Sequence, residues 1–171
     1  MRVMVAIDES DGSFYALKWA LDHLFGSIGV APETNRPEEV GTVVMVYVQQ
    51  PFQQYVFPAG PGGAVAAFYA TSTVVESVRK AQEENAAAIL SRALQMSKDK
   101  MIKAETLILK GEPKDMICEA AEQMHVDLLV VGSRGLGTFK RAILGSVSDY
   151  CAHHAKCPIL IVKPPKDSST K

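Results

Sequence analysis

The sequence lacks the features that define several large classes of protein. Its 171 residues carry 18 Lys and Arg against 19 Asp and Glu, a net charge of −1. This balance argues against a nucleic-acid groove or an anionic membrane surface as the main partner. Only three cysteines are present, Cys118, Cys151 and Cys157, in odd number and without Cys-x-x-Cys spacing, so a disulfide framework is not expected. A reducing compartment, the cytoplasm or alternatively the nucleus, therefore fits best.

Long hydrophobic runs are also missing. The apolar segment at the start of the chain ends at Asp8, too early for the core of a signal peptide. No other run approaches the ~20 residues of a transmembrane helix. A chain of this length folds as one domain and buries roughly two-thirds of its unfolded surface. We therefore expect a soluble, intracellular domain over residues 1–163 and a disordered polar tail over residues 164–171.

The usual catalytic signatures are absent as well. The chain has no Gly-x-Ser-x-Gly elbow, no His-Glu-x-x-His pair and no kinase loop. Of the four histidines, His153 and His154 are adjacent, so on a helix they diverge by about 100 degrees and share one metal poorly. His23 and His125 have no evident metal partner in the sequence. No carboxylate pair is evident for the Mg²⁺ of phosphoryl transfer, and Asp8 is at most a possible contact.

What the sequence does contain is an alternation of two patterns. Continuous apolar runs predict buried strands, and apolar residues at helical spacing predict the helices between them. The strands are expected at residues 1–7, 42–48, 103–110, 128–131 and 158–162, with helices that begin near Phe14, Thr73, Pro113 and Ser146. Such alternation predicts an α/β fold, a single-domain, five-stranded parallel doubly wound sheet with helices on both faces. Ligands of these sheets bind beyond the carboxyl ends of the strands, where the strand order reverses.

One segment interrupts this alternation. Residues 49–75 contain no charged side chain, and prolines and glycines separate the aromatic residues between 51 and 70. An insertion of this length is usually a lid, a surface for a partner or a disordered segment. All three interpretations of the 51–70 insertion stay open from the sequence.

The glycine-rich stretch after the fourth strand is the main candidate for a site. Gly132 and Gly135 leave their backbone amides accessible, and Gly145-Ser146 begins a helix with Asp149 in a Ser-x-x-Asp capping box. A strand, a glycine loop and a helix N-terminus together suit an anion such as a phosphate. Turn glycines and an ordinary cap are the alternative interpretation. The glycine order also differs from the dinucleotide fingerprint, and no P-loop is present.

The spacing of this stretch resembles a known family. Gly132, two residues, Gly135, nine residues and then Gly145-Ser146 is similar to the nucleotide loop of the universal stress protein family, in its ATP-binding, plant-like branch. The segments 127–135 and 157–162 and the opening Val3-Met-Val-Ala-Ile-Asp-Glu-Ser10 also match that family. The resemblance covers nearly the whole chain. It implies the strand order 3-2-1-4-5, which places the reversal between the first and fourth strands.

The resemblance also implies a set of contacts to an adenine nucleotide, ATP or AMP, with Mg²⁺ possible. The adenosine contacts would be Ala6, Ile7, Asp8 and Val46, and the phosphate contacts Gly132, Arg134, Gly135, Gly145, Ser146, Val147 and Ser148. Asp8 has a second interpretation as a turn or cap residue, and Arg134 as an ordinary surface arginine.

These features favour a nucleotide-binding module that acts as a switch or signalling protein in a stress response, with an unknown downstream partner. The alternatives are a slow ATPase or autophosphorylating protein that uses Ser146 or Ser148, and a chaperone-like protein that uses the apolar insertion. Turnover, if present, is expected to be slow.

A homodimer is expected through the fifth strand, Pro158–Val162. The third strand carries Lys103, Glu105 and Lys110, the kind of charges that discourage pairing at a sheet edge, whereas the fifth has none before Lys163. Dimerisation through this strand is also what the family resemblance implies.

Overall fold

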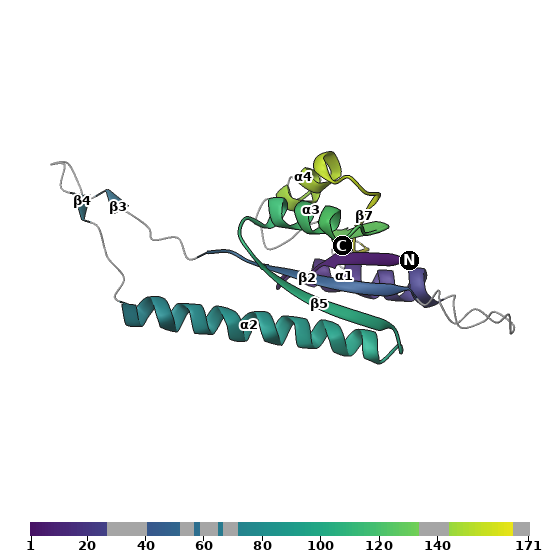
Figure 1. The fold of residues 1–171 in the computed structure, drawn as a ribbon, viewed down its shortest axis with the longest axis horizontal. Coiled ribbons are helices and arrows are strands. Elements are labelled where there is room, and N and C mark those ends of the chain that lie inside the picture. Colours follow the sequence, from purple (N-terminus) through teal and green to yellow (C-terminus); the bar gives the residue numbers. More distant parts are fainter. Residues whose placement is uncertain (27–40, 52–56, 59–64, 67–71, 134–143, 166–171) are drawn as a thin grey trace, which may run out of the picture.

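The structure is a computed structural model that describes residues 1–26, 41–51, 57–58, 65–66, 72–133 and 144–165. Five parallel strands form one sheet in the order β5-β2-β1-β6-β7, which confirms the predicted 3-2-1-4-5 order (Figure 1). Their bounds are β1 Arg2–Ala6, β2 Thr42–Gln49, β5 Lys103–Lys110, β6 Leu128–Gly132 and β7 Ile159–Val162. The predicted α/β doubly wound class is thus confirmed.

In the described part of the chain, four helices cover the two faces of the sheet. Helix α1 spans Asp11–Ala20 and continues into a π-helical turn, Leu21–Phe25; α2 spans Ser72–Lys98, α3 Pro113–Gln123 and α4 Ser146–His154. Helices α1 and α2 pack on one face of the sheet, and α3 and α4 on the other (Figure 1). Pro113 occupies the first turn of α3, where its missing N–H costs no hydrogen bond.

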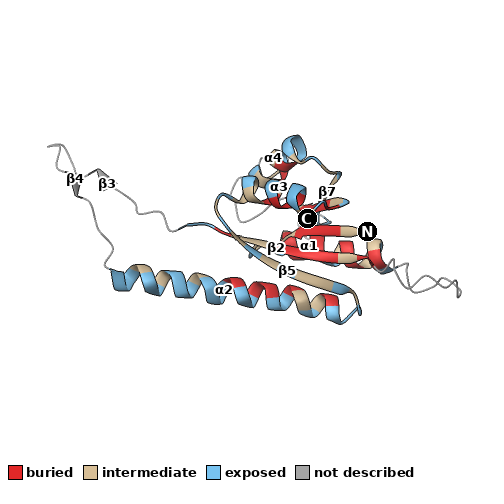
Figure 2. Ribbon diagram, viewed as in Figure 1, coloured by how far each residue is buried: buried red, intermediate tan, exposed pale blue. Residues whose placement is uncertain are grey.

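The core has two layers because neighbouring side chains of a strand point to opposite faces. In β1, Val3 and Val5 belong to the layer under α1 and α2, while Met4 belongs to the layer under α3 and α4. All three side chains are completely buried, as expected for the central strand of a doubly wound sheet (Figure 2).

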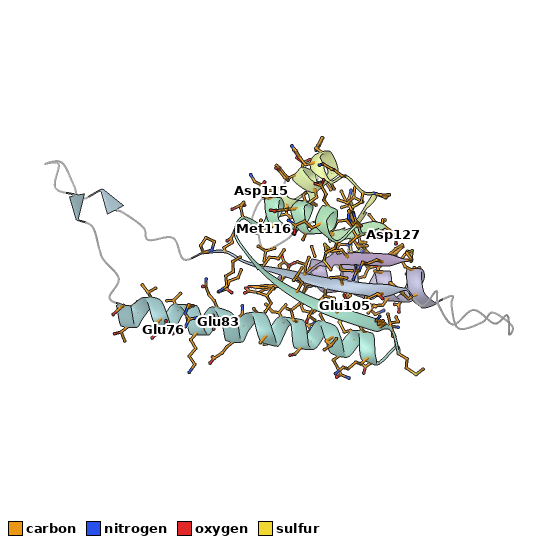
Figure 3. All side chains as sticks on the ribbon, viewed as in Figure 1. Glu76, Glu83, Glu105, Asp115, Met116 and Asp127 are labelled. Atoms are coloured by element: carbon orange, nitrogen blue, oxygen red, sulfur yellow. The ribbon has the colours of Figure 1, made fainter. Side chains whose placement is uncertain are left out.

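Helix α2 is buried only in its second half. Ala86, Ile89 and Ala93 contact the core, while the first half of the helix is mostly exposed (Figure 2). That exposed half carries an ion-paired cluster in which Arg79 bonds Glu76 and, at 2.9 Å, Glu83. Figure 3 labels the two glutamates on this part of the helix. Helix α2 begins at Ser72, one residue before the start near Thr73 that the sequence predicts.

The charge-free insertion is only partly described. Gln49 still belongs to β2, and a short antiparallel pair, β3 Phe57–Pro58 with β4 Val65–Ala66, lies within the insertion. The rest of residues 51–70, apart from Pro51, lies outside the described residues, as do residues 166–171 of the expected tail. The proposed roles of both segments therefore remain predictions. No described helix is long and apolar enough to cross a bilayer.

Gly132, at the end of β6, packs directly on the first turn of α1. A Cβ atom at this position would lie 2.9 Å from the carbonyl oxygen of Gly12 and 3.2 Å from the amide nitrogen of Ser13. The sequence suggested that this glycine leaves room for a ligand. The structure adds a packing reason, since α1 and β6 approach each other too closely for a side chain.

We expect Gly132→Ala to lower the free energy of unfolding by about 1–3 kcal/mol, the usual cost of overpacking against rigid backbone. Gly26→Ala is the matched control, because the one neighbour of a Cβ there among the described residues lies at 3.8 Å, and the backbone is helical. Urea unfolding of both variants checks this, and equal stabilities would show that the close approach is not constraining.

Candidate functional site

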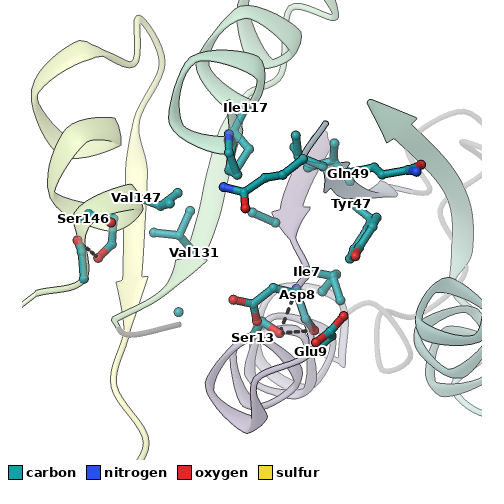
Figure 4. A pocket seen from close by; sticks show the side chains of 18 of the residues that line it. Ile7, Asp8, Glu9, Ser13, Tyr47, Gln49, Ile117, Val131, Ser146 and Val147 are labelled. Carbon is teal, nitrogen blue, oxygen red and sulfur yellow. Dashed lines mark hydrogen bonds between the residues drawn. The ribbon is translucent and has the colours of Figure 1, made fainter. Parts of the chain in front are cut away.

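A cavity of about 810 Å³ opens at the carboxyl ends of β1, β2 and β6, where the strand order reverses. Residues from α2, α3 and the first turn of α4 complete its walls (Figure 4). Nine of the eleven residues predicted for the nucleotide line it: Ala6, Ile7, Asp8, Val46, Gly132, Gly145, Ser146, Val147 and Ser148. Arg134 and Gly135, the other two, lie outside the described residues.

The first turn of α4 forms one side of the cavity. Gly145 is its N-cap, with an extended backbone at φ −73° and ψ 157°, and no side chain in the described part of the chain caps it. The expected Ser-x-x-Asp box is therefore wrong: Ser146 is already the first helical residue and is exposed. The amides of residues 146–148 belong to the four at a helix start that have no partner within the helix. They lie at the positive end of the helix dipole, where an anion is stabilised.

Ser148 has a different role from its neighbour Ser146. Its side chain is buried, and its hydroxyl lies 2.9 Å from the carbonyl oxygen of Gly145 and 3.3 Å from that of Ser133. The amide of Gly145 also donates to the carbonyl of Ser133, at 2.8 Å. These bonds hold the two ends of the glycine-rich loop together. The hydroxyl of Ser148 is thus engaged with the backbone, whereas Ser146 is open to the solvent.

Asp8 follows β1 directly and lies at the cavity while also shaping the turn into α1. Its Oδ1 accepts hydrogen bonds from the amide of Ser10, at 2.9 Å, and from the Ser10 hydroxyl. Ser10 in turn caps α1 by accepting from the amide of Ser13, at 3.3 Å. The turn role that the sequence left open for Asp8 is therefore present, and the carboxylate still borders the cavity (Figure 4).

A polar wall that the sequence did not suggest faces α4 across the cavity. Gln49 of β2, only 7% exposed, donates to the side-chain oxygen of Gln82 on α2, at 3.2 Å. One turn further along α2, Asn85 donates to the carboxylate of Glu9. Tyr47 lies on the same side (Figure 4), and burial, followed by the charge of Glu9, raises the pKa of its hydroxyl. In the sequence, the three-residue spacing of Gln82 and Asn85 on a predicted helix indicates only that the two side chains share a face of that helix. It does not indicate that the helix lies beside β2.

Apolar side chains form the remaining surface of the cavity. Ile7 and Val46 come from the ends of β1 and β2, and Val131 from β6. Ile117 contributes from α3, on the opposite face of the sheet from α2. The cavity therefore combines an apolar lining with an amide-rich helix start, a wall of neutral polar groups and the carboxylates of Asp8, Glu9 and Asp149. Among the described residues, no three His, Cys, Asp or Glu side chains are grouped so that they could hold a metal ion.

Comparison with known proteins assigns this fold to a family. Residues 1–163 match the model of the universal stress protein family. The chain belongs to that family. Universal stress protein YxiE of Bacillus subtilis is 31% identical over 162 residues, 95% of this chain and 98% of the relative. The Universal stress protein A-like protein of Arabidopsis thaliana is 48% identical over 59 residues, which is 34% of either chain.

Solved structures share the fold. A universal stress protein family protein from Arabidopsis thaliana with AMP bound aligns with a TM-score of 0.65 at 23% identity, over 100% of this chain and 96% of its own. A universal stress protein in complex with cAMP aligns with a TM-score of 0.62 at 23% identity, over 96% of this chain and 98% of its own. At these identities the likeness concerns the fold alone, and the ligands are those of the neighbours.

Proposed function

We propose that this universal stress protein binds an adenine nucleotide, ATP or AMP, in the cavity and acts as a nucleotide-dependent switch or signalling protein in a stress response. The observation that carries the proposal is the α4 N-terminus, which no described side chain caps, at the wall of a cavity of about 810 Å³ at the reversal of strand order. This volume lies within the roughly 300–1,000 Å³ that is typical of small-molecule sites. The AMP and cAMP ligands of the fold neighbours support the same class of ligand.

The two ends of a nucleotide match the two sides of the cavity. Phosphates suit the side formed by Ser146 and Val147, where the amides and dipole of α4 favour negative charge. The base has apolar faces and polar edges, which suit the side with Ile7 and the neutral groups of Tyr47 and Gln49 (Figure 4). Neutral amides there can satisfy the edge of a base without the cost of burying an unpaired charge.

The possible roles of Asp8 in binding, a contact to the nucleoside or a contact to Mg²⁺, can be distinguished by experiment. If its carboxylate contacts the nucleoside, Asp8→Ala should weaken adenosine and ATP binding alike, on the order of tenfold for a hydrogen bond to a charged group. If it contacts Mg²⁺, only ATP binding in the presence of metal should weaken. We expect the first outcome, together with a lower stability because the bonds from Ser10 are lost. Calorimetry with both ligands, with and without Mg²⁺, decides, and unchanged affinities would limit Asp8 to the turn.

Slow phosphoryl transfer is the alternative function, and the structure narrows where it could act. Of the two candidate acceptors, Ser146 and Ser148, the first has an exposed hydroxyl, while that of Ser148 is buried and bonded to the backbone, which favours Ser146. Steady-state turnover of ATP and intact-mass measurement after incubation with ATP separate this alternative from binding alone.

The direct test of the ligand class is mass spectrometry of small molecules released on denaturing the purified protein. We expect AMP or ATP at close to one molecule per chain. Purified protein without nucleotide, which also fails to take up added AMP or ATP, would overturn the proposal.

We further propose that the protein is a homodimer joined through β7. Among the described residues, this strand pairs on one side only, with β6. Ile159, Leu160 and Ile161 remain partly exposed there. On the other edge of the sheet, β5 carries Lys103, Glu105 and Lys110 along its length. An uncharged apolar edge is stabilised by pairing with its own copy across a two-fold axis.

A further inference from the structure

Two of the three cysteines meet where α3 packs on α4. Cys118 on α3 and Cys151 on α4 have their sulfur atoms 3.6 Å apart. Both belong to the core layer between these helices and the sheet. They are 33 positions apart in the sequence, so only the fold brings them together. Cys157, the third cysteine, is also free and half-buried in this layer, but no such sulfur contact involves it among the described residues.

We propose that Cys118 and Cys151 form an intramolecular disulfide when the protein meets a hydroperoxide, so that the chain carries an oxidant-responsive dithiol beside its cavity. A disulfide requires about 2.05 Å between the sulfur atoms, so the two must approach by about 1.5 Å. Cys118 is half-buried and Cys151 completely buried, so Cys118 is the more accessible of the two to a small oxidant. We therefore expect the oxidant to react with Cys118 first, and Cys151 to form the disulfide in a second step.

In the first step the Cys118 thiolate attacks one oxygen of the hydroperoxide and the O–O bond breaks. The sulfur becomes a sulfenic acid, and the other oxygen leaves as water or as an alcohol. In the second step the Cys151 sulfur attacks the Cys118 sulfur, the S–O bond breaks and water leaves. The two thiols lose two protons and two electrons in total, which reduce the hydroperoxide. Excess thiol such as dithiothreitol reverses the reaction by exchange.

The surroundings of the pair make this reaction slow. Burial raises the pKa of Cys118, and the nearby Asp115 carboxylate adds to the effect. Burial raises the pKa of Cys151 further, to about 12. Since the thiolate is the reactive form, we expect the pair to respond to sustained oxidant, in contrast to the fast reaction of a cysteine with a lowered pKa.

The location of the pair links it to the cavity through neighbouring residues. Ile117, which lines the cavity, immediately precedes Cys118, and Ser148 lies one helical turn before Cys151. A disulfide between the two cysteines would join α3 to α4 and close a loop that contains the whole glycine-rich segment. It restricts the unfolded chain, and we expect the melting temperature to rise on the order of 10 °C.

The test treats the full-length protein with hydrogen peroxide, alkylates free thiols under denaturing conditions and maps the peptides by mass spectrometry. We expect a peptide pair linked through Cys118 and Cys151, a Cys157 that is alkylated, and a melting temperature that rises on oxidation and falls again with dithiothreitol. Cys118→Ser should abolish the link and the shift. Cys157→Ser is the matched control and should keep both. Cys151→Ala provides a second variant with a small apolar side chain in case the buried position does not tolerate serine.

Three results would overturn the proposal: free thiols at both positions after prolonged treatment, a link that involves Cys157 or a second chain, or Cys118 oxidised to the sulfinic acid while Cys151 stays free. None of these measurements depends on nucleotide. The outcome is therefore independent of the function proposed above.

Discussion

Ser146→Glu is expected to remove ATP binding while the protein stays folded. Ser146 is exposed at the first helical position of α4, where a carboxylate interacts favourably with the helix dipole. The melting temperature without ligand should therefore be unchanged or slightly higher. The same carboxylate would stand where the proposed phosphates bind, and two unit charges at 4 Å repel by about 4 kcal/mol at an effective dielectric constant of 20. We expect ATP affinity to fall by at least a hundredfold.

Two comparisons make this result specific to the phosphates. Ser146→Ala removes the hydroxyl without adding charge and should change ATP affinity by less than about tenfold, the cost of one hydrogen bond. Adenosine has no phosphate, so its affinity should be nearly equal in the wild type and in Ser146→Glu. Calorimetric titrations provide both numbers. An undiminished ATP affinity in the glutamate variant would place the phosphates elsewhere.

The second large effect concerns the proposed dimer, for which Ile161→Pro is expected to give a monomer. The carbonyls of Pro158 and Val162 accept from Leu129 and Ser133, so these even-numbered positions face β6. Strand alternation then directs the N–H and C=O of Ile159 and Ile161 to the open edge. Proline at 161 removes an outward donor and leaves the β6–β7 ladder intact, as prolines on edge strands do. Because both strands of a two-fold ribbon carry the substitution, the dimer loses this hydrogen-bond donor twice.

Ile161→Ala is the matched control, since it also shortens the side chain but keeps the N–H. In sedimentation velocity at micromolar concentration, we expect the wild type and Ile161→Ala to run as dimers and Ile161→Pro as a monomer. A monomeric wild type would end the proposal of a dimer through β7. A dimeric proline variant would show that the interface does not depend on hydrogen bonds from the backbone of this strand.

The fold could be predicted from the sequence because its signals are local and strong. The run Leu128–Val131 is apolar without interruption, and it is a strand buried on both faces. Pro113 marks the start of a helix, and the structure begins α3 there. The strand order came from the family resemblance, because periodicity does not record which strands are neighbours.

The site residues that directly follow a strand could be predicted from the sequence. Those that reach the cavity through the packing of a helix could not. Asp8 and Gly132 end neighbouring strands, so the strand order alone brings them to one cavity. Gln82 and Asn85 reach it from α2, and neither residue type nor spacing indicates the side chains they meet. The capping box at Ser146 was wrong for a physical reason, since extended Gly145 takes the N-cap and leaves the first turn without a described side-chain cap. That difference matters, because a side-chain cap would occupy an amide offered to a phosphate.

The proposed nucleotide site can be tested by calorimetric titration of AMP into the wild-type protein, after bound nucleotide has been removed. We expect one AMP to bind per chain and ATP to displace it. At a hundred times the dissociation constant, AMP should raise the free energy of unfolding by roughly 2.7 kcal/mol. An absence of binding heat and of thermal stabilisation at millimolar AMP and ATP would contradict the proposed site.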